Sequence, residues 1–373
     1  GMGVGVPGTG MIGLPVAAAV GITGGNPDAG LEVLKTLTPE QVDAAKALLP
    51  IIKVDVKDVP DVLYAEVLAE ADGHSARVVI CTDHTRIVLL EKDGEVLMEQ
   101  DSAPGVQIQP AKSDKPAMTL REIVAFALEV PLTEIAFIRE AASMNQALAD
   151  EGLQGYGLRI GKILTEQVER KLLSDDLMTL AMRLSSAASD ARMDGAMLPA
   201  MSNSGSGNQG IAATMPVVAA ARFLKADDEQ LARALVMSHL VAIYIKAYQN
   251  KLSALCAAST AAMGSGAAIT WLLGGQFEQI SHCINNMIGD VSGIICDGAG
   301  SACSMKVSTS TSAAVKSSLM AINNLHVPQS EGIVSDDVDQ TIANLGRLSK
   351  QGMLDTDIEI INIMRAKQQG KAG

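Results

Sequence analysis

A run of small polar residues, Ser202-Asn203-Ser204-Gly205-Ser206-Gly207-Asn208-Gln209-Gly210, stands directly before an apolar stretch that begins near Ile211. Its glycines let the backbone approach a ligand, and its hydroxyls, amides and the following helix N-terminus can donate hydrogen bonds to an anion. The run lacks the Lys-Ser/Thr pair of a Walker loop, and no strand precedes it as a dinucleotide-binding fingerprint requires. It would suit a carboxylate or phosphate, but a plain inter-helix loop with a good N-cap is the competing interpretation.

Five cysteines are the second source of chemistry. Cys256 lies among Ala, Ser and Thr, whereas Cys296 and Cys303 flank a Gly-Ala-Gly turn. Three thiolates could hold an iron-sulfur cubane with one iron open to substrate, whereas a structural zinc site would use four ligands. Free cysteines are also among the most buried residue types, so three core thiols are the alternative. Cys81 and Cys283 are interpreted as packing residues.

Two of the five histidines are candidates for acid–base chemistry, His84 and His239. His239 lies in an apolar helical stretch, where a buried structural histidine and a catalytic one are equally good interpretations. The sequence has no Ser-His-Asp ordering and no His-Glu-x-x-His pair, so triad hydrolysis and zinc proteolysis have no support.

The composition excludes several classes of function. The chain has 373 residues, 48% apolar and 19% charged, which predicts a folded protein of two or three domains. Its net charge of −13 and its 2% of aromatic residues argue against a nucleic-acid partner. The uncharged stretch 252–277 is long enough to span a bilayer, but its small residues favour a buried helix and no membrane partner.

The odd number of cysteines and the lack of an export signal favour a reducing cytoplasm. The composition is compatible with a homo-oligomer.

Two kinds of periodicity predict an α+β fold, with a small antiparallel-sheet lobe and helices followed by a large all-α domain. Residues 1–49 read as mostly helical. Alternation of period two predicts strands over 52–57, 64–70, 76–81, 86–91 and 95–98, with Asp93-Gly94 as a hairpin turn. The stretch 102–116, rich in Pro, Gln, Lys and Ser, is interpreted as a linker, which places the domains at 1–112 and 113–373.

Beyond the linker the pattern predicts helices and no strand. The helical stretches are about 119–129, 131–148, 161–189, 211–224, 227–248, 252–272, 276–287, 311–323 and 335–349.

Several segments together resemble the L-cysteine desulfidase family, which is related to the iron-sulfur-dependent L-serine dehydratase alpha subunit. The resemblance runs from Gly3 to about Met364. The segments that carry it are Ser189 to Met193, Leu198 to Gly210, Leu252 to Cys256, and Gly289 to Gly293 leading to Cys296 and Cys303.

The resemblance implies a [4Fe-4S] cluster held by Cys256, Cys296 and Cys303, because these positions match the family's cluster cysteines. It also implies β-elimination from a small L-amino acid, with L-cysteine giving pyruvate, ammonia and sulfide, and L-serine as second choice. The expected cradle for the substrate's carboxylate and ammonium is Ser202, Asn203, Ser204, Gly205, Ser206, Gly207, Asn208 and Gln209.

Two departures from the family bear on the catalytic residues. Family members carry a Gly-Cys-Thr-Glu-Pro motif upstream of the part that this chain resembles, so we expect an N-terminally truncated lobe and poor turnover. Where the family resembles Gly-His-Thr-Asn, this chain has Asp83-His84-Thr85-Arg86. The general base is therefore unknown, with His84 and His239 as weak candidates.

Two other functions stay open. The chain could be a cluster-free protein that binds or senses a small carboxylate through the Ser202 to Gly210 run, or an inactive truncated homologue. Reconstitution with iron and sulfide, followed by an assay of sulfide release from L-cysteine, separates these from the lyase.

Overall fold

The chain divides into two compact units. The computed structural model describes residues 3–61, 63–100, 118–249 and 252–369. The smaller unit is Val6–Asp114, and a helical unit combines Gly1–Gly5 with Lys115–Gly373. The whole of the predicted linker, 102–116, lies outside the described residues. The predicted α+β class, with a small antiparallel sheet and a large helical region, is confirmed.

The smaller unit begins with short helices around a small apolar core. A two-residue strand β1 (Gly5–Val6) pairs with β2 (Met11–Ile12), and α1 (Leu14–Gly24) and α2 (Pro39–Leu48) follow, separated by a 3₁₀ turn. Thr38 caps α2 by accepting a hydrogen bond from the Gln41 N–H, and the Gln41 side chain accepts one from the Thr38 N–H. The core residues shared by the helices include Val16, Val20 and Ala45.

Four antiparallel strands form the sheet of the smaller unit, in the order β3-β4-β5-β6. They are β3 (Tyr64–Ala71), β4 (His74–Cys81), β5 (Ile87–Lys92) and β6 (Glu95–Glu99). The predicted hairpin turn is confirmed, because Asp93 and Gly94 have φ angles of 52° and 82°, as a type I′ turn needs. The predicted strand at 52–57 is wrong, because the structure has no strand there and β3 pairs only with β4.

The helical unit contains α3 to α14. The bounds are α3 (Leu120–Glu129), α4 (Leu132–Ile135), α5 (Arg139–Gly152), α6 (Ile160–Glu169), α7 (Leu177–Met193), α8 (Gly207–Leu224), α9 (Asp228–Ala247), α10 (Ala257–Leu272), α11 (Phe277–Val291), α12 (Ala302–Ala321), α13 (Val338–Arg347) and α14 (Leu354–Gln369).

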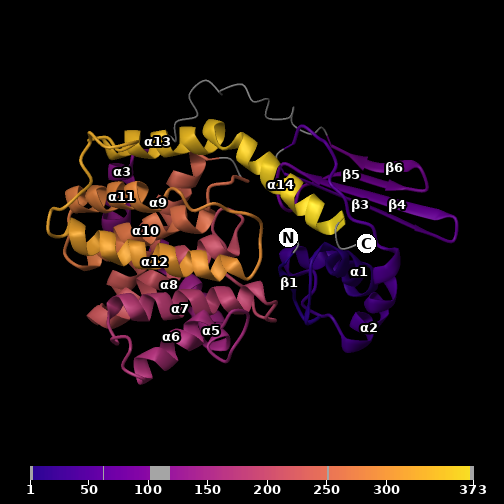
Figure 1. The fold of residues 1–373 in the computed structure, drawn as a ribbon, viewed down its shortest axis with the longest axis horizontal. Helices are drawn as coiled ribbons and strands as arrows, with labels where there is room; N and C mark the ends of the chain where they lie inside the picture. The colour runs from indigo at the N-terminus through magenta and orange to yellow at the C-terminus, as the bar shows by residue number, and fades with distance from the viewer. Residues whose placement is uncertain (1–2, 62, 101–117, 250–251, 370–373) are drawn as a thin grey trace. The chain divides into compact units, whose positions relative to one another are not determined.

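Helix α10 lies at the centre of the helical unit, in contact with α8, α9, α11 and α12 (Figure 1). Its small residues allow this close packing. A Cβ on Gly264 would lie 2.2 Å from the carbonyl oxygen of Ser238 on α9, so only glycine fits there. No helix in the described part of the chain is both long and apolar enough to cross a membrane.

Several predictions of helix extent differ from the structure. The stretch 131–148 contains α4, a 3₁₀ turn and α5, and 252–272 is helical only from Ala257. The stretch 161–189 is two helices, α6 and α7, because residues 170–176 are turns and bends between them. Helix α12 begins at Ala302 instead of 311, so it includes Cys303. Helix α14 was not predicted at all.

Candidate active site

Cys256 and Cys296 are joined through a short antiparallel backbone contact. The Cys256 N–H donates to the Ile294 carbonyl at 3.0 Å, and the Cys296 N–H donates to the Ala254 carbonyl at 2.6 Å. Between these bonds Leu255 and Ile295 form a bridge. Because side chains alternate across such a ribbon, the two cysteines lie on the same face, opposite that of Leu255 and Ile295.

Cys303 reaches the same region from the start of α12. Gly298, with a φ of 101°, turns the chain after Cys296, and the Cys303 thiol lies 3.9 Å from the Gly298 carbonyl oxygen. Cys256 is itself the N-cap residue of α10. Two of the three cysteines therefore lie at helix N-termini, which carry partial positive charge.

The three thiols interact electrostatically. The pKa of Cys296 is raised by burial, and although an N–H of Gly298 lowers it, the charges of Cys256 and Cys303 raise it further. Cys283 is elsewhere: it is fully buried on α11, and its sulfur lies 3.6 Å from the Ser318 hydroxyl. Cys81 is buried in the sheet of the smaller unit.

Three cations from three helices lie near these thiols. Burial opposes the charge of Lys306 on α12, but its 2.5 Å ion pair with Asp297 and the charges of Cys256 and Cys296 outweigh burial and raise its pKa. Burial lowers the pKa of Lys246 on α9 to about 8, against the opposing effect of the same two thiols. Burial also lowers the pKa of Arg192 on α7, against the charge of Cys303.

These cations were not predicted from the sequence. The signal that could have pointed to Lys246 is its place directly after the apolar run of α9. Arg192 lies inside a segment that carried the family resemblance.

Within the described residues, no group of three or more His, Cys, Asp or Glu side chains is arranged to hold a single metal ion. A cluster makes a different demand, because each thiolate binds a different iron instead of converging on one centre. The sulfur donors and the surrounding positive charge fit an anionic thiolate cluster better than a mononuclear site.

Residues 202–210, which we call the polar loop, form a tight turn that leads into α8. Asn203 and Ser206 exchange two backbone hydrogen bonds of 3.1 and 3.0 Å, and Ser204 and Gly205 between them have positive φ angles of 49° and 83°. Ser206 then caps α8 by accepting from the Gln209 N–H. The N–H groups of Gly207 and Asn208, in the first turn, have no acceptor within the helix.

His239, which lies on α9, contacts the polar loop through Asn203. Asn203 Nδ2 donates to the His239 carbonyl at 3.2 Å and to His239 Nδ1 at 3.1 Å. His239 Nδ1 is therefore an acceptor, so Nε2 carries the ring hydrogen and donates to Thr214 Oγ1 at 2.9 Å. Burial lowers the pKa of His239 to about 4, which keeps the ring neutral.

A chain of hydroxyls connects the polar loop with the cysteines. Ser304, next to Cys303, donates to Ser189 on α7 at 3.1 Å, and Ser189 donates to Asn208 Oδ1 at 3.2 Å. The structure thus brings the start of α8 and the start of α12 onto the same part of α7. His84, in contrast, belongs to the smaller unit, in the turn after β4, with Nδ1 3.7 Å from Asp83 Oδ1.

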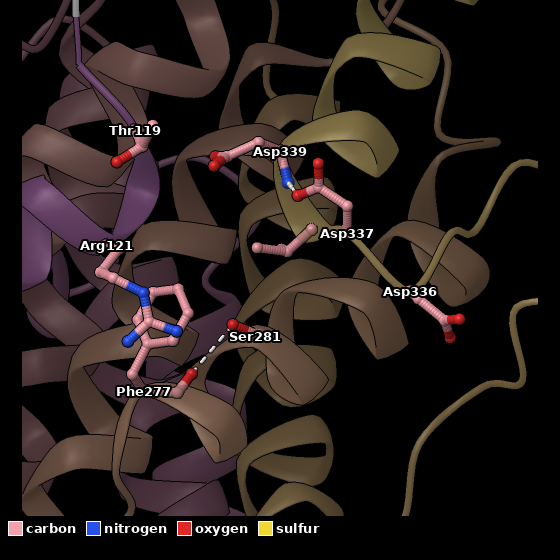
Figure 2. A pocket seen from close by; sticks show the side chains of 8 residues that line it. Thr119, Arg121, Phe277, Ser281, Asp336, Asp337 and Asp339 are labelled. Carbon is pink, nitrogen blue, oxygen red and sulfur yellow. Dashed lines mark hydrogen bonds between the residues drawn. The ribbon is translucent and has the colours of Figure 1, made fainter.

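A pocket of about 360 Å³ lies elsewhere in the helical unit, between the starts of α3, α11 and α13. Figure 2 shows Arg121 stacked on the ring of Phe277 at one wall, with Asp337 and Asp339 at the other. None of the residues predicted to bind substrate or metal lines it. The Asp339 carboxylate is already engaged by the Tyr244 hydroxyl and the Leu120 N–H.

The chain is similar to several known proteins over almost its whole length. A UPF0597 protein of Aeromonas salmonicida is 94% identical over 372 residues, covering 100% of this chain and 86% of the relative. UPF0597 proteins of Shewanella pealeana and Yersinia enterocolitica are 56% and 54% identical, each over 98% of this chain and over 86% and 85% of their own lengths. The family model described as serine dehydratase alpha chain matches residues 28–362, a span that includes every cysteine and the whole polar loop. The chain therefore belongs to the serine dehydratase alpha chain family.

Proposed function

We propose that this protein is an iron-sulfur-dependent lyase that eliminates the β-substituent of a small L-amino acid, with L-cysteine preferred and L-serine second. L-cysteine would lose sulfide to give aminoacrylate, which takes up water and yields pyruvate and ammonia. Membership of the serine dehydratase alpha chain family supports a lyase of this class. The observation that carries the proposal is geometric: Cys256 and Cys296 lie on one face of paired backbone segments, and Cys303 follows the Gly298 turn at the start of α12.

Cys256, Cys296 and Cys303 would hold a [4Fe-4S] cluster through their sulfur atoms. The cluster would supply a Lewis acid at the iron without a cysteine ligand, which stabilises the departing thiolate or hydroxide. The chain's own part would be to stabilise the negative charge of a bound cluster. The N-termini of α10 and α12, together with Lys306, Lys246 and Arg192, provide positive charge for this.

The polar loop would position the substrate mainly through its backbone. The side chain of Asn203 is used inside the protein, because it bonds to His239, Ser204 and Gln209. The first N–H groups of α8 stay directed at a ligand. His239 would accept a proton at Nδ1 only by giving up its bond with Asn203, so we assign it the role of holding Asn203. His84 stays a candidate for the base.

Anaerobic reconstitution tests the proposal. The protein is loaded with iron and sulfide, and bound iron and visible absorption are measured. Sulfide release from L-cysteine and pyruvate release from L-cysteine and L-serine are then assayed. We expect bound iron, sulfide release from L-cysteine, and a lower kcat/KM for L-serine. Iron binding without elimination from either amino acid contradicts the lyase. Binding of a small carboxylate by a protein that takes up no iron supports the cluster-free alternative.

A further inference from the structure

The Arg192 side chain lies across the start of α8. A Cβ built on Gly207 would lie 2.2 Å from Arg192 Nε and 2.9 Å from its Cζ. Any residue larger than glycine at 207 would therefore displace the guanidinium. This contact fixes where the guanidinium is: beside the first turn of α8.

The guanidinium of Arg192 has no carboxylate partner among the residues that the structure describes. The hydrogen bond that it makes is from Nη1 to the Met193 sulfur at 3.1 Å. A thioether is a weak acceptor, and a guanidinium offers five donors, so most of the donor capacity is unused. A half-buried cation with unused donors is costly unless an anion pairs with it.

The surroundings of Arg192 also favour an anion. The first N–H groups of α8, a helix of 18 residues, lie beside it and carry partial positive charge. The charge of Cys303 acts on Arg192, so the guanidinium is within electrostatic range of the cysteines. An anion held here would lie close to the proposed cluster ligands.

The other two cations near the cysteines are already engaged. Lys306 pairs with Asp297 at 2.5 Å. Lys246 has an interaction of its own. Of the three, Arg192 is the one whose planar guanidinium matches a carboxylate. The described residues provide no carboxylate for it.

We propose that Arg192 binds the carboxylate of the amino-acid substrate, together with the N–H groups of Gly207 and Asn208. The assignment of this carboxylate to a substrate rests on the proposed function. Arg192 would thus set the distance between the substrate's carboxylate and the cysteines.

Binding of an unreactive amino acid tests this assignment without turnover. L-alanine has the carboxylate and ammonium but no β-leaving group, and L-alaninol lacks the carboxylate. Calorimetry or saturation-transfer NMR measures their binding to the protein before and after reconstitution. We expect L-alanine to bind more tightly than L-alaninol. Arg192→Lys and Arg192→Gln should weaken L-alanine binding by about tenfold to a hundredfold and leave L-alaninol binding unchanged.

Two further variants make the test specific. Gly207→Ala keeps Arg192 but displaces it, and should weaken L-alanine binding in the same direction. Arg183→Gln removes an arginine from the same helix that pairs with Asp175, and should leave L-alanine binding unchanged. In the reconstituted enzyme, Arg192→Lys should raise the KM for L-cysteine by a similar factor, with a smaller change in kcat and unchanged bound iron.

The outcomes separate this inference from the proposed function. If the protein eliminates nothing but L-alanine binding depends on Arg192, the lyase is wrong and the carboxylate assignment stands. If Arg192→Gln and Gly207→Ala both turn over L-cysteine with an unchanged KM, the assignment is overturned and the lyase stands. If the Arg192 variants fold but lose bound iron while L-alanine affinity is unchanged, Arg192 serves Cys303 and the assignment is wrong.

Discussion

The surroundings of His239 and those of Arg192 are both polar and both lie at the start of α8, yet their hydrogen-bonding groups are used differently. Around His239, both ring nitrogens, the Asn203 amide and the Thr214 hydroxyl bond to one another. Around Arg192, a cation with five donors has a single sulfur acceptor among the residues that the structure describes. The first arrangement holds the fold in one geometry, and the second leaves hydrogen-bond donors that the described residues do not use.

The residues of the polar loop differ in the same way. From the sequence, all of its amides and hydroxyls were equally good ligands for a substrate. In the structure, Asn203 and Gln209 are buried and bonded to each other, whereas Ser204 and Gly205 are exposed. The loop therefore combines a structural half with a half that can meet a ligand.

The largest effect is expected at the cysteines. Cys296→Ser replaces a thiolate by a hydroxyl, which is a poor ligand for iron, and should lower bound iron after reconstitution by at least about tenfold. Cys256→Ser and Cys303→Ser should do the same. Iron content and visible absorption measure the change.

Cys283→Ala is the control for these variants, because Cys283 is a fully buried thiol on α11. It should keep the iron content of the unmodified protein. Full iron binding by Cys296→Ser would show that the cysteine cluster is only a packing arrangement.

The next effect is on stability, at the centre of the His239 network. Asn203→Ala removes the partners of His239 Nδ1, the Ser204 hydroxyl and Gln209 Nε2, and leaves buried groups without a hydrogen bond. We expect a loss of about 3–4 kcal/mol in the free energy of unfolding. Urea unfolding followed by circular dichroism measures it, and an unchanged midpoint would contradict the structural role.

Acid should weaken the same network. Burial lowers the pKa of His239 from 6.5 to about 4, so between these values the unfolded chain binds a proton that the folded chain does not. Stability from this group is complete above pH 6.5 and is lost as pH falls toward 4, by about 3 kcal/mol. His239→Gln should flatten this part of the stability profile in urea titrations at several pH values. A profile of equal steepness in the variant would assign the acid sensitivity to other groups.

The smallest effect is expected at Ser204, on the exposed side of the polar loop. Its hydroxyl donates to Asn203 Oδ1, which also accepts from Gln209. Ser204→Ala should therefore change the free energy of unfolding by no more than about 0.5 kcal/mol. A loss as large as that of Asn203→Ala would erase the distinction between the two halves of the loop.

Local patterns predicted most of the elements. Alternation and the Asp93-Gly94 turn were enough for the sheet, because hairpin strands pair with their chain neighbours. The prediction of a strand at 52–57 was wrong because an alternating sequence does not by itself provide a neighbouring strand to pair with. The start of α12 was missed because its first residues, 302–310, are rich in Ser and Thr, which have low helix propensity.

The site depended on distant contacts that a sequence does not display. The polar loop and the cysteines were recognisable as candidates from their residue types. Arg192 was not, because its importance comes from lying on Gly207 and from having no carboxylate partner in the described part of the chain. Neither property is local to its own helix.

The backbone contact that joins Cys256 to Cys296 has a consequence for the order of assembly. The two segments are separated along the chain by the whole of α10 and α11, so a long loop must close before they pair. Loop closure costs entropy that is repaid only when both helices have docked. We therefore expect the thiols to stay apart in the nascent chain and to meet only once the helical core has formed.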